Sequence, residues 1–489
     1  MNPVCDTYNM REEEGNLSKK KLTRREFLAV SKSAAIGGVI AAGVIGGVAG
    51  YLAGSGAAPA KTVTETVTQT TTKEVGAATV TTTVTQAGGI TTVTQPGAAT
   101  TVTETKEVTK TVTAGAKPLK VGYIYVGPVG DFGWTYAHDR GRKWADEKFG
   151  NVESSYIESV PEAEATGAIE SLITQGADLV ITTSFGYMDA TAEVAEKYPD
   201  KYFVHISGYR SGAAGNAPMN MSAAFAEFYQ LYYLNGLAAG AVTETGVVGY
   251  VAAHPIPEVV RHINAFVLGA NYAYKKRTGK NIKAYVDWLF SWFDPGKTRT
   301  AATALVEEKN ADVLAFTEDS PTTLQVAEEY QKKGRKVWSF SHYSDMTQYG
   351  PTAHLTGQVV NWGPFYLDFY RMVATGTWQS VDIWARIGDY MPWRWRRKPE
   401  ESTAGQPEGA VYLAPINPAI PSEWQTEIKE RYEEMKELLF EPFSPEGNLG
   451  EPIRDQDGTV RIGAGERADH DMLWSMDWFV EYIESKLPR

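Results

Sequence analysis

Short apolar runs alternate with amphipathic segments from residue 119 onward, and this alternation constrains the fold more than any other feature of the chain. The first unit occupies residues 121–144. Its apolar run ends at the turn Gly127-Pro128-Val129-Gly130, and a polar and aromatic cluster then leads into a segment with helical spacing. This succession predicts a strand, a loop and a helix. Its repetition favours a mostly parallel sheet covered by helices.

The pattern starts again at residue 246, which indicates a second α/β lobe and places the end of the first lobe near Thr245. In sheets of this kind, ligands bind beyond the carboxyl ends of the strands. Two lobes with facing sets of loops therefore imply a ligand cleft between them. We expect an α/β fold of two doubly wound lobes that enclose such a cleft.

The loops after the predicted strands share one character, because they combine aromatic and acidic side chains with turn residues. The candidate ligand-binding residues are Asp131, Trp134, Phe185, Asp189, Glu258, Trp292, Asp294, Asp319, Asp345 and Trp362. Aromatic rings supply flat faces for stacking, and carboxylates accept hydrogen bonds from the edge of a ligand. The set therefore suits a planar, hydrogen-bonding solute such as a purine.

Each candidate also has a structural interpretation. An aromatic residue can belong to the core, which we prefer for the tryptophans inside predicted strands and helices. Trp134 and Trp292 differ from these, because loop aromatics beside turn residues are seldom core residues. Acidic residues can cap helices, and this alternative stays open for Asp131, Asp189 and Asp294, which each precede a predicted helix.

Composition excludes several classes of function. The chain has 489 residues and a net charge of −12, which argues against nucleic acid as a partner. Its one cysteine, Cys5, excludes a disulfide within the chain and any cysteine-based metal centre. The histidines are scattered and show no metal-ligand spacing. We expect neither a cofactor nor a bound metal.

Residues 1–60 resemble an export signal. Thr23-Arg24-Arg25-Glu26-Phe27-Leu28 contains a twin arginine, and an uncharged run rich in small and apolar residues extends from residue 33 to about residue 60. This combination is typical of a Tat signal. The alternative is a membrane anchor preceded by positive charge. Both interpretations place the body of the protein outside the cell membrane, secreted or tethered to its outer face.

Residues 61–117 are of low complexity and consist largely of threonine and valine. The alternation favours strand-like backbone, but the segment offers no large apolar side chains for a core. We interpret it as an extended stalk that carries threonine sites for O-glycosylation. The alternative is a weakly formed β or coiled segment.

The carboxyl-terminal part adds two local predictions. Asp455-Gln456-Asp457-Gly458 favours a hairpin turn between Ile453 and Ile462 over a calcium loop, since the third acid and the distant glutamate of such a loop are absent from the sequence. Residues 470–485 are expected to form a final helix docked on the second lobe.

Several longer stretches match one protein family: GPVGDFGWTYAHDRGR, TTSFGYMDA, HPIPEVVRHINAF, DPGKTRTAATALVEE, TEDSP, SDMTQY and VNWGPFY. From about residue 120 to about residue 483, the chain resembles the basic membrane protein family, substrate-binding proteins of ABC importers that are related to purine nucleoside receptors. The resemblance implies a type I periplasmic-binding fold with three crossovers, near Thr245, Asp345 and Trp378. Lobe 1 would comprise residues 118–245 and 346–378, and lobe 2 residues 246–345 and 379–489.

The resemblance also implies ligand-binding roles for Asp131, Trp134, Phe185, Asp189, Trp292 and Asp345. Nucleoside-binding members usually carry an Asp-Asp-x-Ser-Phe-Asn type of first loop, from which this chain departs. The bulk of Trp134 there favours a nucleobase over a nucleoside. A second departure is the length of residues 391–408, whose tryptophans and arginines could touch the permease or the membrane surface. A solvated insertion is the preferred interpretation.

Three functions stay open at this point. The first is a tethered receptor that closes on a purine-like nucleobase or nucleoside and delivers it to an ABC transporter permease. The second is an exported enzyme acting on a small heterocycle, although the chain contains no G-x-S-x-G or H-E-x-x-H and no G-x-G-x-x-G after Tyr125. The third is a ligand sensor for a signalling partner. We favour the receptor and expect no catalytic residues.

Overall fold

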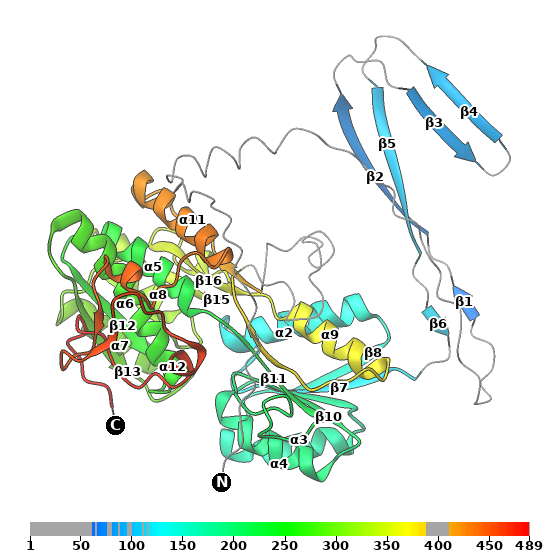
Figure 1. Ribbon diagram of the computed structural model, residues 1–489, viewed down its shortest axis with the longest axis horizontal. Helices are drawn as coiled ribbons and strands as arrows, with labels where there is room; N and C mark the ends of the chain where they lie inside the picture. The colour runs from blue at the N-terminus through cyan, green and yellow to red at the C-terminus, as the bar shows by residue number, and fades with distance from the viewer. Residues whose placement is uncertain are drawn as a thin grey trace, which may run out of the picture. The chain divides into compact units, whose positions relative to one another are not determined.

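The computed structural model describes residues 117–387 and 410–488 in full, together with the backbone of six strands between Lys61 and Ala114. The predicted signal at residues 1–60 and the predicted insertion at residues 391–408 lie outside the described residues. Contacts within the chain divide it into two units, Met1–Gly115 and Ala116–Arg489 (Figure 1).

The described strands of the threonine-rich unit pair antiparallel in three nested ladders: β1 (Lys61–Val63) with β6 (Val112–Ala114), β2 (Thr66–Val75) with β5 (Thr100–Thr109), and β3 (Thr81–Gln86) with β4 (Gly89–Thr94). Pairing of this kind satisfies backbone groups that a single extended run leaves to water. The paired strands correspond to the β alternative, and the extended stalk stays a prediction.

Lobe 1 is built on one parallel sheet with the strand order β17-β11-β10-β9-β7-β8. The strands are β7 (Leu119–Ile124), β8 (Val152–Ile157), β9 (Leu179–Thr182), β10 (Tyr202–Ile206), β11 (Met221–Ala226) and β17 (Asp382–Ala385). Helices α2 (Trp134–Phe149) and α9 (Gly363–Ala374) pack together on one face, and α3 (Ala165–Thr174) and α4 (Met188–Lys197) pack together on the other (Figure 1).

Lobe 2 contains two three-stranded sheets, ordered β13-β12-β14 and β15-β16-β18, which meet at a bridge between Val313 and Trp338. The strands are β12 (Val247–Ala252), β13 (Lys283–Trp288), β14 (Val313–Phe316), β15 (Ser339–Tyr343), β16 (His354–Val360) and β18 (Val411–Leu413). All pairs are parallel except β16 with β18. The helices are α5 (Tyr229–Val242), α6 (Pro257–Thr278), α7 (Pro295–Glu307), α8 (Thr322–Lys332) and α11 (Ser422–Lys436).

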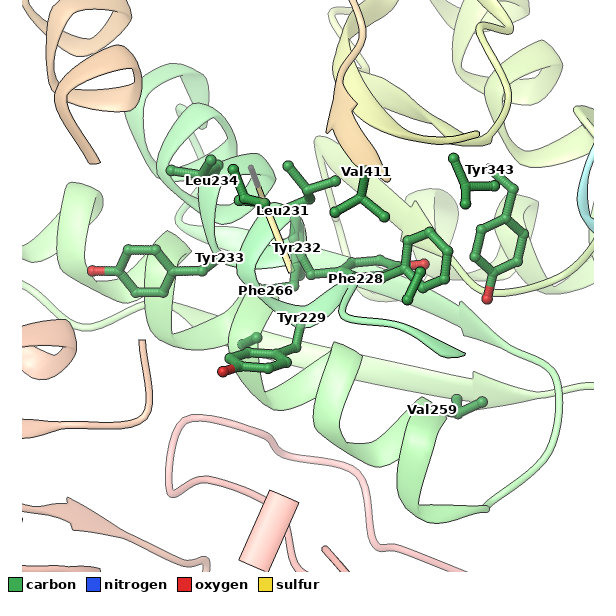
Figure 2. Packing of buried hydrophobic residues seen from close by; sticks show 14 of the residues in the cluster. Phe228, Tyr229, Leu231, Tyr232, Tyr233, Leu234, Val259, Phe266, Tyr343 and Val411 are labelled. Atoms are coloured by element: carbon green, nitrogen blue, oxygen red, sulfur yellow. The ribbon is translucent and has the colours of Figure 1, made fainter. Parts of the chain in front are cut away.

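The crossovers correct our predicted lobe boundaries. The chain leaves lobe 1 at residues 227–228, returns at residues 361–362, and leaves again between β17 and β18. We expected these points near residues 245, 345 and 378. Helix α5 explains the first error, because it is buried along almost its whole length and packs against α6 (Figure 2). A helix that is apolar all round lies inside a core, and here that core belongs to lobe 2.

The carboxyl-terminal segment packs against lobe 2 and crosses to lobe 1. The predicted hairpin is confirmed, since β19 (Ile453–Arg454) pairs antiparallel with β20 (Val460–Ile462) and Ile453 lies opposite Ile462. The predicted final helix is wrong in length, because α12 covers only His470–Trp474. The aromatic residues beyond it pack as non-helical backbone instead, with Trp478 and Phe479 buried.

Candidate functional site

The carboxyl ends of strands from both lobes face each other around a small pocket. We call its lobe-1 residues the lobe-1 wall and its lobe-2 residues the lobe-2 wall: Val126, Trp134, Ser184, Phe185 and Ser207 in the first, and Glu258, Trp292, Asp319 and Tyr343 in the second. The cavity has a volume of about 20 Å³, which corresponds to roughly one water molecule. The two walls are therefore in a closed arrangement.

Trp134 begins α2 and is held rigidly in the lobe-1 wall. Its side chain is 6% exposed, and its indole Nε1–H donates to the carbonyl oxygen of Thr183 at 2.5 Å. Its ring meets the ring of Tyr343 from the opposite wall edge-on, with centroids 4.9 Å apart. Gly133 makes this approach possible, because a Cβ atom there would lie 2.6 Å from the carbonyl oxygen of Asp319.

Asp131 is fully buried just outside the pocket lining and caps the loop that carries Trp134. Its carboxylate accepts backbone hydrogen bonds from Gly133, Thr135 and Tyr136, each at 2.9 Å. Burial raises the pKa of this carboxyl to about 7, although the three backbone donors act in the opposite direction. The capping interpretation therefore accounts for the contacts of Asp131.

Glu258 joins the two walls. It lies in the first turn of α6, and its carboxylate accepts hydrogen bonds from the Ser207 hydroxyl of lobe 1 at 2.8 Å and from the Tyr343 hydroxyl of lobe 2 at 3.2 Å. Both donors have left-handed backbone, with φ of 78° and 61°. Burial raises the pKa of Glu258. A second lobe-to-lobe hydrogen bond runs from the Ser344 hydroxyl to the carbonyl oxygen of Phe132.

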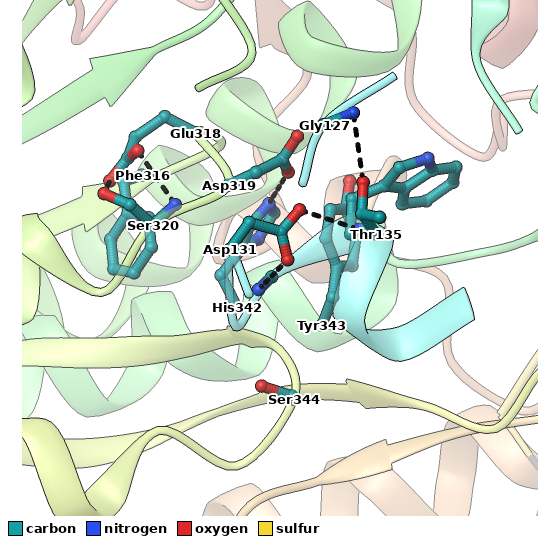
Figure 3. Close-up of polar contacts among 12 residues, drawn as sticks. Gly127, Asp131, Thr135, Phe316, Glu318, Asp319, Ser320, His342, Tyr343 and Ser344 are labelled. Carbon is teal, nitrogen blue, oxygen red and sulfur yellow. Dashed lines mark hydrogen bonds and ion pairs between the residues drawn. The ribbon is translucent and has the colours of Figure 1, made fainter. Parts of the chain in front are cut away.

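Asp319 follows β14 and faces Asp131 across the lobe boundary (Figure 3). Burial raises its pKa well above the usual range, and the nearby charges of Asp131, Glu318 and Glu258 raise it further. His342 Nε2 lies 4.0 Å from an Asp319 carboxylate oxygen, but burial lowers the pKa of His342 well below its usual value. The imidazole is therefore neutral and does not form an ion pair with Asp319.

Trp292 is packed less tightly than Trp134. It is half-buried, its ring contacts that of His254 at 4.9 Å, and its carbonyl oxygen accepts from the backbone N–H of Asp319 at 2.8 Å. Phe185 of the lobe-1 wall is also half-buried. Trp134 and Trp292 thus lie in opposite walls of one pocket, as we expected.

The structure brings together half of the predicted residues: Trp134, Phe185, Glu258, Trp292 and Asp319. The others lie outside the lining. Asp189 is exposed and pairs with Arg210, Asp294 caps α7 through the Lys297 N–H, and Asp345 accepts from the Thr347 N–H. Trp362 is fully buried and stacks on His138 behind Trp134.

Sequence reasoning missed four lining residues: Val126, Ser184, Ser207 and Tyr343. Val126, Ser184 and Ser207 come one or two residues after a strand, and Tyr343 is the last residue of β15. Position directly at a strand end was therefore a usable signal, independent of residue type.

The described residues hold no group of histidines, cysteines and carboxylates that could bind a metal ion. Within the same residues, no helix combines the length and the hydropathy needed to cross a bilayer. The walls offer stacking faces and carboxyl groups and are suited to binding a small solute.

Comparison with known proteins places the chain among substrate-binding proteins of ABC transporters. The family described as "ABC transporter substrate-binding protein PnrA-like" matches residues 119–389. A purine-binding protein of Brucella abortus is 38% identical over 373 residues, which cover 76% of this chain and 94% of that protein. A putative ABC transporter glucose-binding protein of Haloferax volcanii is 35% identical over 274 residues, 56% of this chain and 66% of that protein.

The fold is confirmed by a solved structure. An ABC transporter solute-binding protein of Aeropyrum pernix matches with a TM-score of 0.56 at 14% identity, and the match covers 73% of this chain and 95% of that protein. The arrangement of two α/β lobes is therefore that of the periplasmic solute-binding proteins, as the sequence motifs implied.

Proposed function

Since the chain belongs to the family of PnrA-like ABC transporter substrate-binding proteins, we propose that it binds a purine-like nucleobase between its two lobes and delivers it to an importer. The members of this family bind small molecules outside the cytoplasm and work with an ABC transporter. The ligand and the direction of transport are the parts that we add.

The facing aromatic walls are the observation that carries the ligand assignment. Trp134 and Trp292 supply flat faces from opposite lobes, and Glu258 and Asp319 place carboxyl groups at the same pocket. A base stacks on such rings with about 1–3 kcal/mol per ring. A carboxylate accepts from ring or amino N–H groups, and a protonated carboxyl also donates to a ring nitrogen or carbonyl oxygen. The relative from Brucella abortus is named for purine binding.

The narrowness of the pocket favours a base over a nucleoside. The rings of Trp134 and Tyr343 lie 4.9 Å apart, and the remaining cavity is about 20 Å³. A flat heterocycle can enter between the walls when Trp292 moves. A ribose adds a non-planar ring and would also require the lobes to separate, which would break the contact between Gly133 and Asp319.

A sugar is the second candidate ligand, because the relative from Haloferax volcanii carries the name of a glucose-binding protein. Aromatic faces combined with carboxylates also suit sugar rings, whose C–H faces pack on indoles and whose hydroxyls donate to carboxylates. The two ligands make different demands, since a sugar needs many directed hydrogen bonds while a base needs parallel stacking.

We also propose the sequence-based assignments outside the described residues. Residues 1–60 would direct Tat-type export and then remain as an anchor or be removed. An anchored chain would present its two lobes to the permease at the outer face of the membrane. An exported enzyme or a sensor would share the export signal, and turnover of the bound heterocycle is the observation that would favour an enzyme.

The test is ligand screening of the full-length protein by thermal shift and calorimetry against adenine, guanine, adenosine, guanosine and glucose. We expect bases to give the largest shift. Trp292→Ala should weaken base binding by about 1–3 kcal/mol. Trp338→Ala is the matched control. Trp338 is also half-buried, but it directly precedes β15, at the end of that strand opposite to Tyr343 and the pocket. Stabilisation by glucose alone would overturn the purine assignment.

A further inference from the structure

The first two crossovers between the lobes carry matching aromatic residues. Phe228 ends the first crossover and is the N-cap residue of α5, and Trp362 ends the second and is the N-cap residue of α9. Their backbone angles are nearly the same, with φ and ψ of −80° and −23° at Phe228 and of −75° and −20° at Trp362. Both side chains are fully buried. The same local structure therefore occurs at both points where the chain changes lobe.

These two residues form a closed circuit with the pocket walls. Phe228 meets Tyr343 of the lobe-2 wall edge-on at 4.7 Å (Figure 2), and Trp362 meets Trp134 of the lobe-1 wall edge-on at 5.6 Å. The circuit is completed by the contact of Phe228 with Trp362 at 6.5 Å and by that of Trp134 with Tyr343 at 4.9 Å. We call these four residues the aromatic circuit.

Each crossover aromatic also contacts a helix that carries a pocket residue: α2 carries Trp134, and α6 carries Glu258. Trp362 stacks on His138 of α2 with centroids 4.6 Å apart and planes 19° from parallel. Phe228 meets His262 of α6 edge-on at 6.0 Å. Burial lowers the pKa of both histidines, so these contacts are between neutral rings. A rotation at either crossover must therefore displace the ring that lines the pocket.

We propose that Phe228 and Trp362 are positioning residues that couple pocket occupancy to lobe closure through the aromatic circuit. Close-packed rings move between discrete arrangements and do not deform continuously. A ligand held between the walls contacts Trp134 and Tyr343, and the crossover rings transmit these contacts to the hinge. This inference rests on the proposed function only in that the lobes close on a ligand.

The experiment measures closure directly by single-molecule energy transfer on the full chain. Labels are attached at Glu196→Cys in lobe 1 and Lys309→Cys in lobe 2, both exposed, in a Cys5→Ser background. Phe228→Leu and Trp362→Phe should each lower the ratio of closed to open molecules without ligand by about 2- to 10-fold, the effect of one lost aromatic pair. With adenine as the probe, both variants should require more ligand for half-closure.

Phe203→Leu is the matched control, because Phe203 is fully buried in the separate core cluster of lobe 1 and touches none of the four rings. It should leave the closed fraction unchanged while lowering the unfolding temperature.

The proposal is overturned if Phe228→Leu and Trp362→Phe close like the wild type, or if Phe203→Leu shifts closure as much as they do. Should Phe228→Leu fail to fold, Trp362→Phe decides alone. A wild type that ignores adenine, with ligand-free closure still shifted in the variants, would refute only the purine ligand.

Discussion

The two walls of the pocket are built differently. In the lobe-1 wall, Trp134 is 6% exposed, its N–H is bonded to Thr183, and Asp131 fixes its loop through three backbone hydrogen bonds. In the lobe-2 wall, Trp292 is half-buried and rests on His254. Trp134 is therefore held in place by its surroundings, whereas Trp292 keeps part of its ring in solvent. A side chain that is already ordered loses less entropy when a ligand binds.

The largest effect should come from removing the rigid indole. Trp134→Ala deletes a buried side chain with contacts to His138, Trp362 and Tyr343, so we expect a loss of about 3–5 kcal/mol in the free energy of unfolding. Trp292→Ala should cost far less stability, because its ring is already partly in water. Chemical denaturation of both variants measures the difference, and equal losses would contradict the contrast between the two tryptophans.

The pH dependence of binding should sharpen the same contrast. Closure buries Asp131 of one lobe against Asp319 and Glu318 of the other, and burial raises the pKa of Asp131 to about 7 and that of Glu318 to about 8. A carboxyl whose pKa rises on closure favours the closed form at low pH, and the benefit is lost as pH rises from about 4 towards 8. Adenine affinity should therefore fall over that range, with each unit of pKa shift contributing about 1.4 kcal/mol.

Two variants identify the groups responsible for this pH dependence. Asp319→Asn keeps the volume of the side chain but cannot ionise, so the affinity should vary less with pH. Glu441→Gln is the control, because burial also raises the pKa of Glu441 to about 7 but its partner is the Tyr229 hydroxyl inside lobe 2. Calorimetry at several pH values should show the wild-type profile for Glu441→Gln, and a flat profile in the wild type would reject the linkage.

The sequence predicted the architecture well because hydrophobic periodicity and turn residues are local signals. The two α/β lobes and the hairpin at Asp457-Gly458 follow from them. The lobe boundaries did not follow, because the choice of lobe for α5 depends on its packing against α6, which is 15 or more residues further on. Periodicity identifies a helix without identifying the sheet that it covers.

The site was predictable in part for the same reason. Loop position selected Trp134, Trp292 and Glu258, which the structure places at one pocket, since strand ends gather at one edge of a sheet. It could not separate an acid that faces the pocket from one that caps a helix, because both lie at the start of a helix. The Asp294 carboxylate accepts from the backbone N–H of Lys297 in the helix that it precedes, while the Glu258 carboxylate accepts from Ser207 of the other lobe.

The contact between the walls can be blocked with one methyl group. Gly133→Ala places a Cβ atom 2.6 Å from the Asp319 carbonyl oxygen, and backbone atoms cannot yield as a side chain does. Overpacking of this kind costs about 1–3 kcal/mol, so ligand affinity should fall by about 5- to 150-fold. Gly130→Ala in the same loop meets no atom within 4 Å and is the control. Unchanged affinity in Gly133→Ala would show that binding does not require the walls to meet.

The smallest effect should come from the hydrogen bond that joins the walls. Ser207→Ala removes the donor that lobe 1 offers to Glu258, which keeps the Tyr343 hydroxyl as its partner in lobe 2. The net value of one such bond is about 0.5–1.5 kcal/mol, so base affinity should fall by about 2- to 10-fold. Ser339→Ala is the control, because the buried Ser339 hydroxyl has no hydrogen-bond partner among the described residues. If both variants bind a base as the wild type does, closure depends on ring packing and does not need this polar contact.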